Sequence, residues 1–324
     1  MKNRFAFTMI ELIFVIVIMG IIGKFGLEFL AQAYKGFLYT NVNHQLQSKS
    51  ESAVEIIAKR LQYRIKDSVI ARKGALGTSK GKPVALGSAS GDDYIILEWV
   101  SADNEGFRGS EQNSTSPNWS GIIDLDGSSA TLLSSPGTDT SVENDLIKDF
   151  SEDNSSTIAD AALYFVGSNS DAESDYGWDG NITYMNAQRG AMHPIKDVAG
   201  NKAAYTNADG TSNFQGVDIY EYYKLARTAY AVVMEDYNTT THTGTLKLYY
   251  NYQPWKDKNG DGVSDQSVGQ YKGPNVKSVT IMDHVSTFKF MSIGSIMKIQ
   301  VCVKSDILQK DGGDYSLCKE KTIL

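Results

Sequence analysis

The chain opens with a run of apolar residues that passes without a break into an amphipathic pattern. Apart from Thr8, Glu11 and two glycines, residues 7–23 are apolar, and beyond them apolar side chains recur at spacings of three, four and seven. Such spacings place side chains on one face of an α-helix, and no proline precedes Pro83. We therefore expect one helix over residues 7–73, about 100 Å long, whose later part packs on a globular head.

The rest of the chain, residues 74–324, is expected to form that head, because short apolar runs and alternating patterns typical of strands recur along it. Strands are expected at residues 94–100, 162–166, 182–185, 229–234, 245–250, 276–282, 285–290 and 295–303. Residues 101–160, rich in Ser, Asn, Asp and Gly, predict long surface loops with minor strands. The predicted class is α+β, a long N-terminal helix on an antiparallel β-sheet head with long loops and a C-terminal β region over about 228–304.

One carboxylate, Glu11, interrupts the first apolar run. A charge near the middle of a bilayer costs about 2.5–3.5 kcal/mol on insertion scales, so a simple membrane anchor has no reason to contain it. Cleavage before Phe7 would create an α-amine too close along the same helix to satisfy Glu11 easily. Between neighbouring subunits, however, the amine and the carboxylate can form a buried pair that sets the register of assembly.

Residues 6–12, Ala-Phe-Thr-Met-Ile-Glu-Leu, resemble the processing site of type IV prepilins and type II secretion pseudopilins. The family usually has Gly where this chain has Ala6. The resemblance implies that a prepilin peptidase removes the leader, residues 1–6, and methylates the new N-terminus at Phe7. It also implies that Glu11 is the assembly carboxylate towards other pilin or pseudopilin subunits. The expected location is a single span among bacterial inner-membrane lipid, with the head in the periplasm or on an extracellular filament.

A weaker resemblance concerns residues 279–290 and 296–301, which look like the terminal strands of J-type minor pseudopilins and W-type minor pilins. In addition, Glu28 stands where major pilins usually carry a proline. Both features favour a minor, tip-located structural subunit of a type II secretion pseudopilus or type IV pilus. A pilin for adhesion or DNA uptake stays open, as does a calcium-dependent binding protein that is anchored in the membrane and does not polymerise.

Two simpler interpretations of the N-terminus remain. A secretory signal peptide would be cut after the small residues Ala31-Gln32-Ala33, although Glu11, Lys24 and Glu28 interrupt that segment. An uncleaved single-span anchor would use residues 7–23, which is at the short end of the roughly 17–25 residues that a span needs. The identity of the mature N-terminal residue distinguishes these alternatives.

Charge is divided unevenly along the 324 residues. The net charge is −7, but residues 1–82 carry 13 lysines and arginines against five acids, while residues 83–324 carry 18 against 33. An acidic head repels the phosphates of nucleic acid, so we expect no nucleic-acid partner. The same acidity suits calcium or a basic partner.

Residues 257–265 have the spacing of a calcium loop from an extracellular protein. Such loops place oxygen ligands at positions one, three and five, glycine at six, a carbonyl at seven and often a ligand or water at nine. Here those positions are Asp257, Asn259, Asp261, Gly262, Val263 and Asp265. Val268 replaces the glutamate that completes an EF-hand, so we expect a weak structural calcium site that takes a further ligand from elsewhere, such as Glu235 or Asp236. The alternative is a turn that binds no ion.

Two cysteines, Cys302 and Cys318, are the only ones in the chain. Their spacing argues against a zinc or thioredoxin-like site. If the head lies outside the cytoplasm, a disulfide between them is expected, tying the tail outside the sheet and away from its core; two unlinked thiols are the alternative. The four histidines are scattered and no catalytic motif occurs, so we expect no enzymatic activity.

Overall fold

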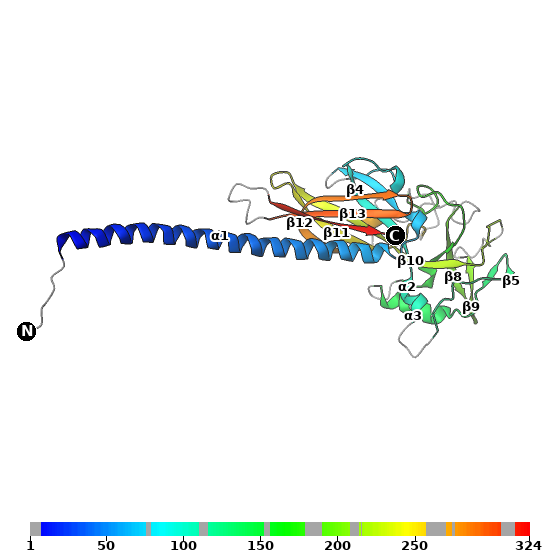
Figure 1. The fold of residues 1–324 in the computed structure, drawn as a ribbon. Helices are drawn as coiled ribbons and strands as arrows, with labels where there is room; N and C mark the ends of the chain where they lie inside the picture. The colour runs from blue at the N-terminus through cyan, green and yellow to red at the C-terminus, as the bar shows by residue number, and fades with distance from the viewer. Residues whose placement is uncertain are drawn as a thin grey trace, which may run out of the picture.

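The computed structural model describes residues 8–75, 79–109, 116–151, 156–178, 190–207, 214, 216–256, 270–273, 276–305 and 315–324. One long helix, α1 (Met9–Leu61), leads into a head built on antiparallel strands (Figure 1). The predicted α+β class, with a long N-terminal helix on an antiparallel sheet, is confirmed.

Helix α1 ends at Leu61, twelve residues before the predicted end at Lys73. After Leu61 the chain does not continue as a helix but pairs with strand β4 (Tyr94–Ala102). Ile65 N donates to Val100 O at 2.9 Å, and Ala102 N donates to Tyr63 O at 2.9 Å. A short 3₁₀ turn (Lys66–Ser68) follows, and Ile70–Ala75 forms strand β1. The apolar residues beyond Leu61 are buried as the pattern suggests, but they belong to strand β1 and to the segment that leads into it rather than to a helix. Over so few residues, the spacing of apolar positions does not distinguish a helix from a strand.

The main part of the sheet runs in the order β14-β13-β12-β11-β10-β4-β1, with every neighbouring pair antiparallel. Its strands are β14 (Ser316–Ile323), β13 (Ile296–Lys304), β12 (Lys277–Ile293), β11 (Thr243–Tyr252), β10 (Tyr223–Asn238), β4 (Tyr94–Ala102) and β1, with the short β2 (Ser79–Lys80) and β3 (Val84–Ala85) beside β1. The predicted hairpin over residues 229–250 is confirmed as β10–β11. The strand predicted at residues 94–100 is confirmed as β4.

Two details of the C-terminal region differ from the prediction. Residues 276–282 and 285–290 form one continuous strand, β12, because the apparent break at His284 is a local irregularity with φ of +59° inside an otherwise paired strand. The tail does not lie outside the sheet either. It forms β14, which pairs with β13 along its whole length, because edge pairing satisfies its backbone groups.

A smaller lobe continues from the first residues of β10. Residue Ala226 of β10 pairs with both Ala102 of β4 and Ala162 of β7, so those two strands lie on opposite edges of β10. The lobe contains β7 (Ala162–Phe165), β8 (Met192–Val198), β9 (Asn201–Asn207), β6 (Leu132–Ser134) and β5 (Asp124–Ser129). The strand predicted at residues 162–166 is confirmed as β7, whereas residues 182–185 lie outside the described residues.

Two helices, α2 (Asn104–Arg108) and α3 (Thr140–Asp149), lie in the segment that was expected to hold only loops and minor strands. Three further 3₁₀ turns lie among the described residues: Leu86–Ser88, Ile158–Asp160 and Gln270–Lys272. Figure 1 shows α2, α3 and the small lobe at the end of the head that lies farthest from the start of α1.

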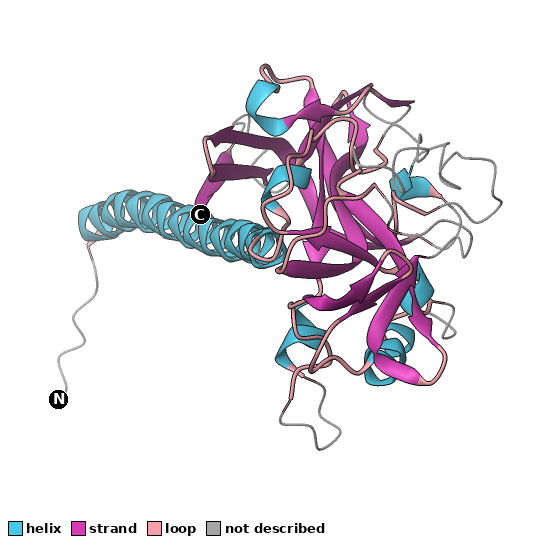
Figure 2. Ribbon diagram, turned by 90° about the vertical axis from the view of Figure 1, so that its right-hand side faces the viewer, coloured by secondary structure: helices cyan, strands magenta, loops and turns pink. Residues whose placement is uncertain are grey.

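The second half of α1 is the hydrophobic support of the main sheet. Its buried residues are Val42, Leu46, Ser50, Ala53, Val54, Ile57, Ala58 and Leu61. Their spacing of three and four makes one apolar stripe, which packs on residues of β4 and β10 to β14. Figure 1 shows this half of the helix running alongside the strands, and Figure 2, turned by 90°, shows the foreshortened helix to one side of them. A second apolar cluster, which includes Trp178, Trp255 and Tyr252, covers the opposite face.

Candidate functional site

The first half of α1 contacts nothing else in the described protein. Its side chains from Thr8 to Asn41 are exposed, except for the half-buried Leu38. Large apolar residues make up most of this surface, including Phe14, Ile18 and Phe25. Of the described helices, α1 is long and apolar enough to cross a membrane. The structure thus separates α1 into a bare apolar half and a half packed on the head (Figure 1).

Glu11 lies in the first turn of this bare half. Its Oε2 accepts hydrogen bonds from Thr8 N at 2.9 Å and from Thr8 Oγ1 at 2.8 Å. The carboxylate therefore caps its own helix, which is the role that Glu takes at the third helical position of a capping box. These bonds satisfy one carboxylate oxygen but add no positive charge, and no cation of the described residues pairs with Glu11. Ala6 and Phe7 lie outside the described residues.

The predicted calcium loop, including Asp257, Asn259, Asp261, Val263 and Asp265, also lies outside the described residues. The described part of the head contains no cluster of three or more His, Cys, Asp or Glu side chains arranged for a metal.

The two carboxylates proposed to complete the calcium site are engaged elsewhere. Glu235 accepts the hydroxyl of Tyr249 at 2.6 Å and pairs with Lys247 at 3.3 Å and with Lys272 at 2.5 Å. Asp236 pairs with Lys247 at 3.0 Å. Despite the burial of Glu235, its hydrogen bonds with Lys272 and Tyr249 hold its pKa below the usual value. Both oxygens of Glu235 are paired with lysines, so a calcium ion would have to displace a lysine to use Glu235.

Cys302 and Cys318 form the predicted disulfide. They are direct partners in the β13–β14 ladder. The neighbours Val301 and Val303 belong to the cluster that packs on α1, whereas Cys302 does not. The disulfide therefore ties the edge strand to the sheet on the face away from α1, as its position in the alternating pattern predicted.

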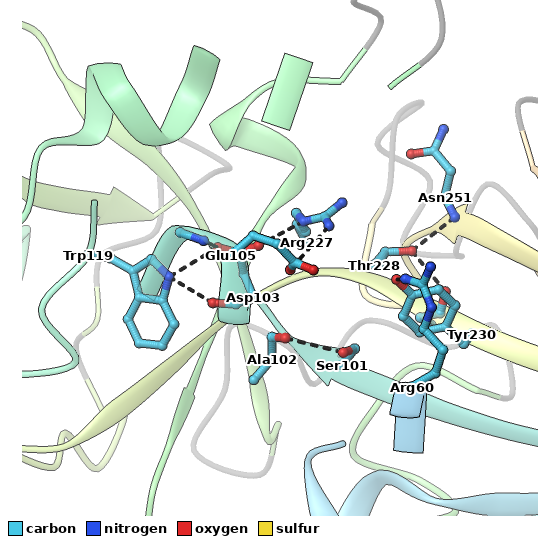
Figure 3. Close-up of polar contacts among 12 residues, drawn as sticks. Arg60, Ser101, Ala102, Asp103, Glu105, Trp119, Arg227, Thr228, Tyr230 and Asn251 are labelled. Atoms are coloured by element: carbon cyan, nitrogen blue, oxygen red, sulfur yellow. Dashed lines mark hydrogen bonds and ion pairs between the residues drawn. The ribbon is translucent and has the colours of Figure 1, made fainter. Parts of the chain in front are cut away.

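A buried charged cluster that the sequence did not reveal lies beyond the end of α1. Asp103, immediately after β4, accepts a hydrogen bond from Gly106 N at 2.8 Å and pairs with Arg227 Nε of β10 at 2.8 Å. Trp119 Nε1 donates to Asp103 O at 3.1 Å and to its Oδ2 at 3.2 Å. Figure 3 shows Asp103 between Trp119 and Arg227, with Glu105 beside Arg227.

Glu143 of α3 completes this cluster and is fully buried. Burial, together with the negative charge of Asp103 and a hydrogen bond between the two carboxyl groups, raises the pKa of Glu143 to about 9. At neutral pH Glu143 is therefore neutral and can donate its proton to Asp103. Burial opposes the guanidinium charge of Arg227, but the nearby Asp103 raises the pKa of Arg227 above its usual value.

Two pockets adjoin the cluster. The first, here named the junction pocket, has a volume of about 560 Å³ and lies between residues 62–64 after α1, residues 102–107, residues 119–122 and residues 222–224, with Val166. The second, of about 260 Å³, shares Tyr63, Ala102 and Asp103 with the first. It contains Arg60, whose guanidinium donates to Tyr230 at 2.8 Å (Figure 3).

Sequence reasoning missed the cluster because its members are far apart along the chain and belong to a segment interpreted as loop. One local signal was present at α3. Asp139 caps this helix by accepting from Ser141 N at 3.0 Å and Val142 N at 3.3 Å. An Asp followed four residues later by Glu143 and then by Ile147 is an ordinary helix start. The pairing with Asp103 and Arg227 has no such signal.

No protein-family model, curated protein or solved structure matches this chain.

Proposed function

We propose that the chain is a structural subunit, minor and tip-located, of a type II secretion pseudopilus or type IV pilus. It enters the filament through α1 after a prepilin peptidase has cut before Phe7 and methylated that residue. The observation that carries this proposal is the bare half of α1, an apolar helix with a carboxylate in its first turn. Other subunits and bacterial inner-membrane lipid are its partners, and it catalyses no reaction.

The exposed surface of α1 requires an apolar environment. Monomeric soluble proteins rarely expose contiguous apolar patches larger than a few hundred Å², whereas here nearly every large side chain from Met9 to Tyr39 is exposed. Before assembly, lipid would cover the first part of this surface, and Lys24 and Glu28, paired at 3.9 Å, would lie where the apolar run ends. In a filament, the helices of neighbouring subunits would cover the same surface.

Glu11 supports assembly over simple anchoring. Its bonds with Thr8 satisfy hydrogen-bonding capacity but not charge, and an unpaired charge in an apolar surrounding is costly. The α-amine of a neighbouring subunit, created at Phe7 by cleavage, would supply the missing positive charge. The disulfide and the acidic head agree with a head outside the cytoplasm, where disulfides form and persist.

The first test is the mature N-terminus of the protein purified from membranes of a bacterial host that has prepilin peptidase. Mass spectrometry should find methylated Phe7. A mature N-terminus after Ala33, or an uncleaved Met1, would contradict the proposal.

The second test separates assembly from anchoring. Glu11→Ala should abolish cross-linking between subunits in the membrane or filament while leaving membrane insertion intact. Glu28→Ala is the matched control, because it removes an acid from the same helix at a position already paired with Lys24; it should cross-link as the wild type does. Normal cross-linking of the Glu11→Ala protein would refute assembly through this carboxylate.

A membrane-anchored, calcium-dependent binding protein that does not polymerise is the second candidate, favoured by the oxygen-rich spacing of residues 257–265. The lysines on either side of that loop pair with acids outside it: Lys256 pairs with Asp160, and Lys272 pairs with Glu235. Calorimetry with calcium on the full-length protein tests it, with Asp261→Asn as the comparison. Heat of binding that this variant loses supports a calcium site; no heat and an unchanged melting temperature exclude it.

A further inference from the structure

One wall of the junction pocket is made of apolar and aromatic side chains. The rings of Phe107 of α2 and Trp119 pack against each other at a tilt of 48°, with centroids 4.8 Å apart, and the ring centroid of Trp119 lies 5.6 Å from that of Tyr223. Phe107 is 48% exposed and Tyr222 is 55% exposed. Trp119 directs its only hydrogen-bond donor away to Asp103, so its ring offers the pocket an apolar surface.

These apolar side chains come from separate segments of the chain but meet in one cavity. Ile122 and Val166, 42% and 45% exposed, add aliphatic surface from the two edges of β10. A volume of about 560 Å³ falls within the usual range for small-molecule sites, which are mostly apolar with a few polar groups that fix orientation. The concentration of exposed large side chains at a concave site distinguishes it from the single exposed residues found on any surface.

The polar end of the pocket is cationic. Lys224 of β10 is half-buried, and no carboxylate of the described residues lies within ion-pair distance of it. Burial, followed by the positive charges of Lys66 and Arg64, lowers the pKa of Lys224, while the negative charge of Asp67 acts in the opposite direction. Asp67 itself accepts the hydroxyl of Tyr164 at 3.1 Å. Lys224 therefore has no carboxylate partner of its own among the described residues.

The acid that lines the pocket does not offset this charge. The side chain of Asp103 is fully buried and already pairs with Arg227. The guanidinium of Arg64, in turn, is already engaged: it donates to Leu61 O at 2.8 Å, to Ser295 O at 3.2 Å and to Leu324 O at 3.4 Å. These bonds fix Arg64 in place, so Lys224 is the cation of the pocket that an anion can pair with.

From this arrangement we propose that the junction pocket binds an amphipathic carboxylate, with its aromatic or aliphatic body against Phe107 and Trp119 and its carboxylate on Lys224. A carboxylate suits the site better than a phosphate, because a doubly charged, strongly hydrated group would lose more solvation in a largely apolar cavity. A free acid and the C-terminus of a peptide share this chemistry. Binding would also relieve the unfavourable burial of the Lys224 ammonium group.

The test uses the full-length protein in lipid nanodiscs, with empty nanodiscs as the blank. Fluorine NMR follows titration with 3-(4-fluorophenyl)propionate and, separately, with its primary amide, which has the same body without the charge. The acid should bind at least tenfold more tightly than the amide. A second pair of probes, acetyl-Gly-Gly-Phe and its C-terminal amide, distinguishes the sources: a peptide terminus is favoured if this acid binds more tightly than the free acid, and a small acid in the reverse case.

Variants test whether the probes bind in the junction pocket. Lys224→Met should remove the preference for acid over amide, and Phe107→Ala should weaken both probes about equally. Lys289→Met, which removes an exposed lysine paired with Asp92 at 2.9 Å, should leave both affinities unchanged. Melting temperatures check that the variants fold, and Lys224→Gln replaces Lys224→Met if the latter does not fold. The proposal fails if the wild type binds neither acid, if acid and amide bind equally, or if the Lys224 variant keeps the preference.

Discussion

The carboxyl groups of Asp103 and Glu143 meet beside Gly106, between α2 and α3. A Cβ atom at Gly106 would lie 2.2 Å from Asp103 Oδ2 and 2.2 Å from Glu143 Oε2, so no larger residue fits between them without displacement. Both side chains are buried. Two carboxylates cannot both be charged at such a site at low cost, and the proton retained by Glu143 makes the arrangement stable. This contact joins the end of β4 to the small lobe.

Glu143→Gln should remove a pH dependence of the unfolding free energy. The pKa of Glu143 is raised from 4.5 to about 9 in the folded protein. The contribution of Glu143 to the free energy of unfolding is therefore fully present below about pH 4.5 and is lost as pH rises towards 9. In that range the unfolded chain releases the proton of Glu143, whereas the folded protein retains it. The loss is at most about 1.4 kcal/mol per pH unit.

Denaturant unfolding at several pH values between 5 and 9, with full-length protein in detergent, measures this slope. Asp145→Asn on the same helix is the control, because Asp145 is largely exposed and pairs with Lys148 at the surface. The Glu143→Gln protein should show the smaller slope and the control should match the wild type. Equal slopes in all three proteins would show that Glu143 does not hold this proton.

Ile57→Ala should destabilise the head far more than Ile56→Ala, although the two residues are adjacent on α1. Ile57 is fully buried against the sheet, whereas Ile56 is 43% exposed. Removing a buried isoleucine side chain typically costs about 2–5 kcal/mol, and an exposed position costs much less. Denaturant unfolding followed by tryptophan fluorescence gives both values. Similar losses for the two variants would contradict the packing of α1 on the sheet.

Arg72→Met should be among the most damaging substitutions in the head. Arg72 Nε lies 2.5 Å from Glu98 Oε1, both side chains are nearly inaccessible, and Tyr252 donates to Glu98 Oε2 at 2.9 Å. Removing one partner leaves a buried charge without compensation, at a cost of about 3–5 kcal/mol. The double variant Arg72→Met/Glu98→Gln should recover part of this loss.

The neighbouring Lys73→Met provides the comparison for that ion pair. Lys73 pairs with Asp93 at 3.5 Å, but both side chains are more than half exposed, and such pairs contribute about 0–1 kcal/mol. Chemical unfolding of the wild type, Arg72→Met, Glu98→Gln, the double variant and Lys73→Met tests the contrast. If the double variant is as unstable as the sum of the two single variants, Arg72 and Glu98 do not act as a pair.

Replacing Cys302 and Cys318 together by serine should weaken the attachment of β14. The disulfide spans 16 residues, and the chain-entropy relation gives about 3 kcal/mol for a loop of that size. β14 also carries Lys321, which pairs with Glu55 of α1, so hydrogen exchange should rise in β14 and in the adjoining part of α1. A reductant should lower the melting temperature of the wild type but not of the double variant.

Several parts of the fold were predictable because neighbouring residues in the sequence determine them. Local periodicity predicts the apolar stripe of α1, the β10–β11 hairpin, β4 and the position of Cys302 on the face of the sheet away from α1. The end of α1 was not predictable in this way. Residues 62–75 have a pattern compatible with helix, but pairing with β4, 21 to 39 residues later in the chain, ends the helix and makes Ile70–Ala75 a strand.

The sequence by itself determined the apolar helix with Glu11 near its start, the acidity of the head and a disulfide between Cys302 and Cys318 once the head lies outside the cytoplasm, because each depends on composition or on short spacing. Only the tertiary structure decided that Asp103, Glu143 and Arg227 share one buried cluster. It also brought Lys224 to a pocket lined by Phe107 and Trp119. The reason is physical: burial and long-range pairing set the environment of a charge, and both arise only when distant strands meet at β10.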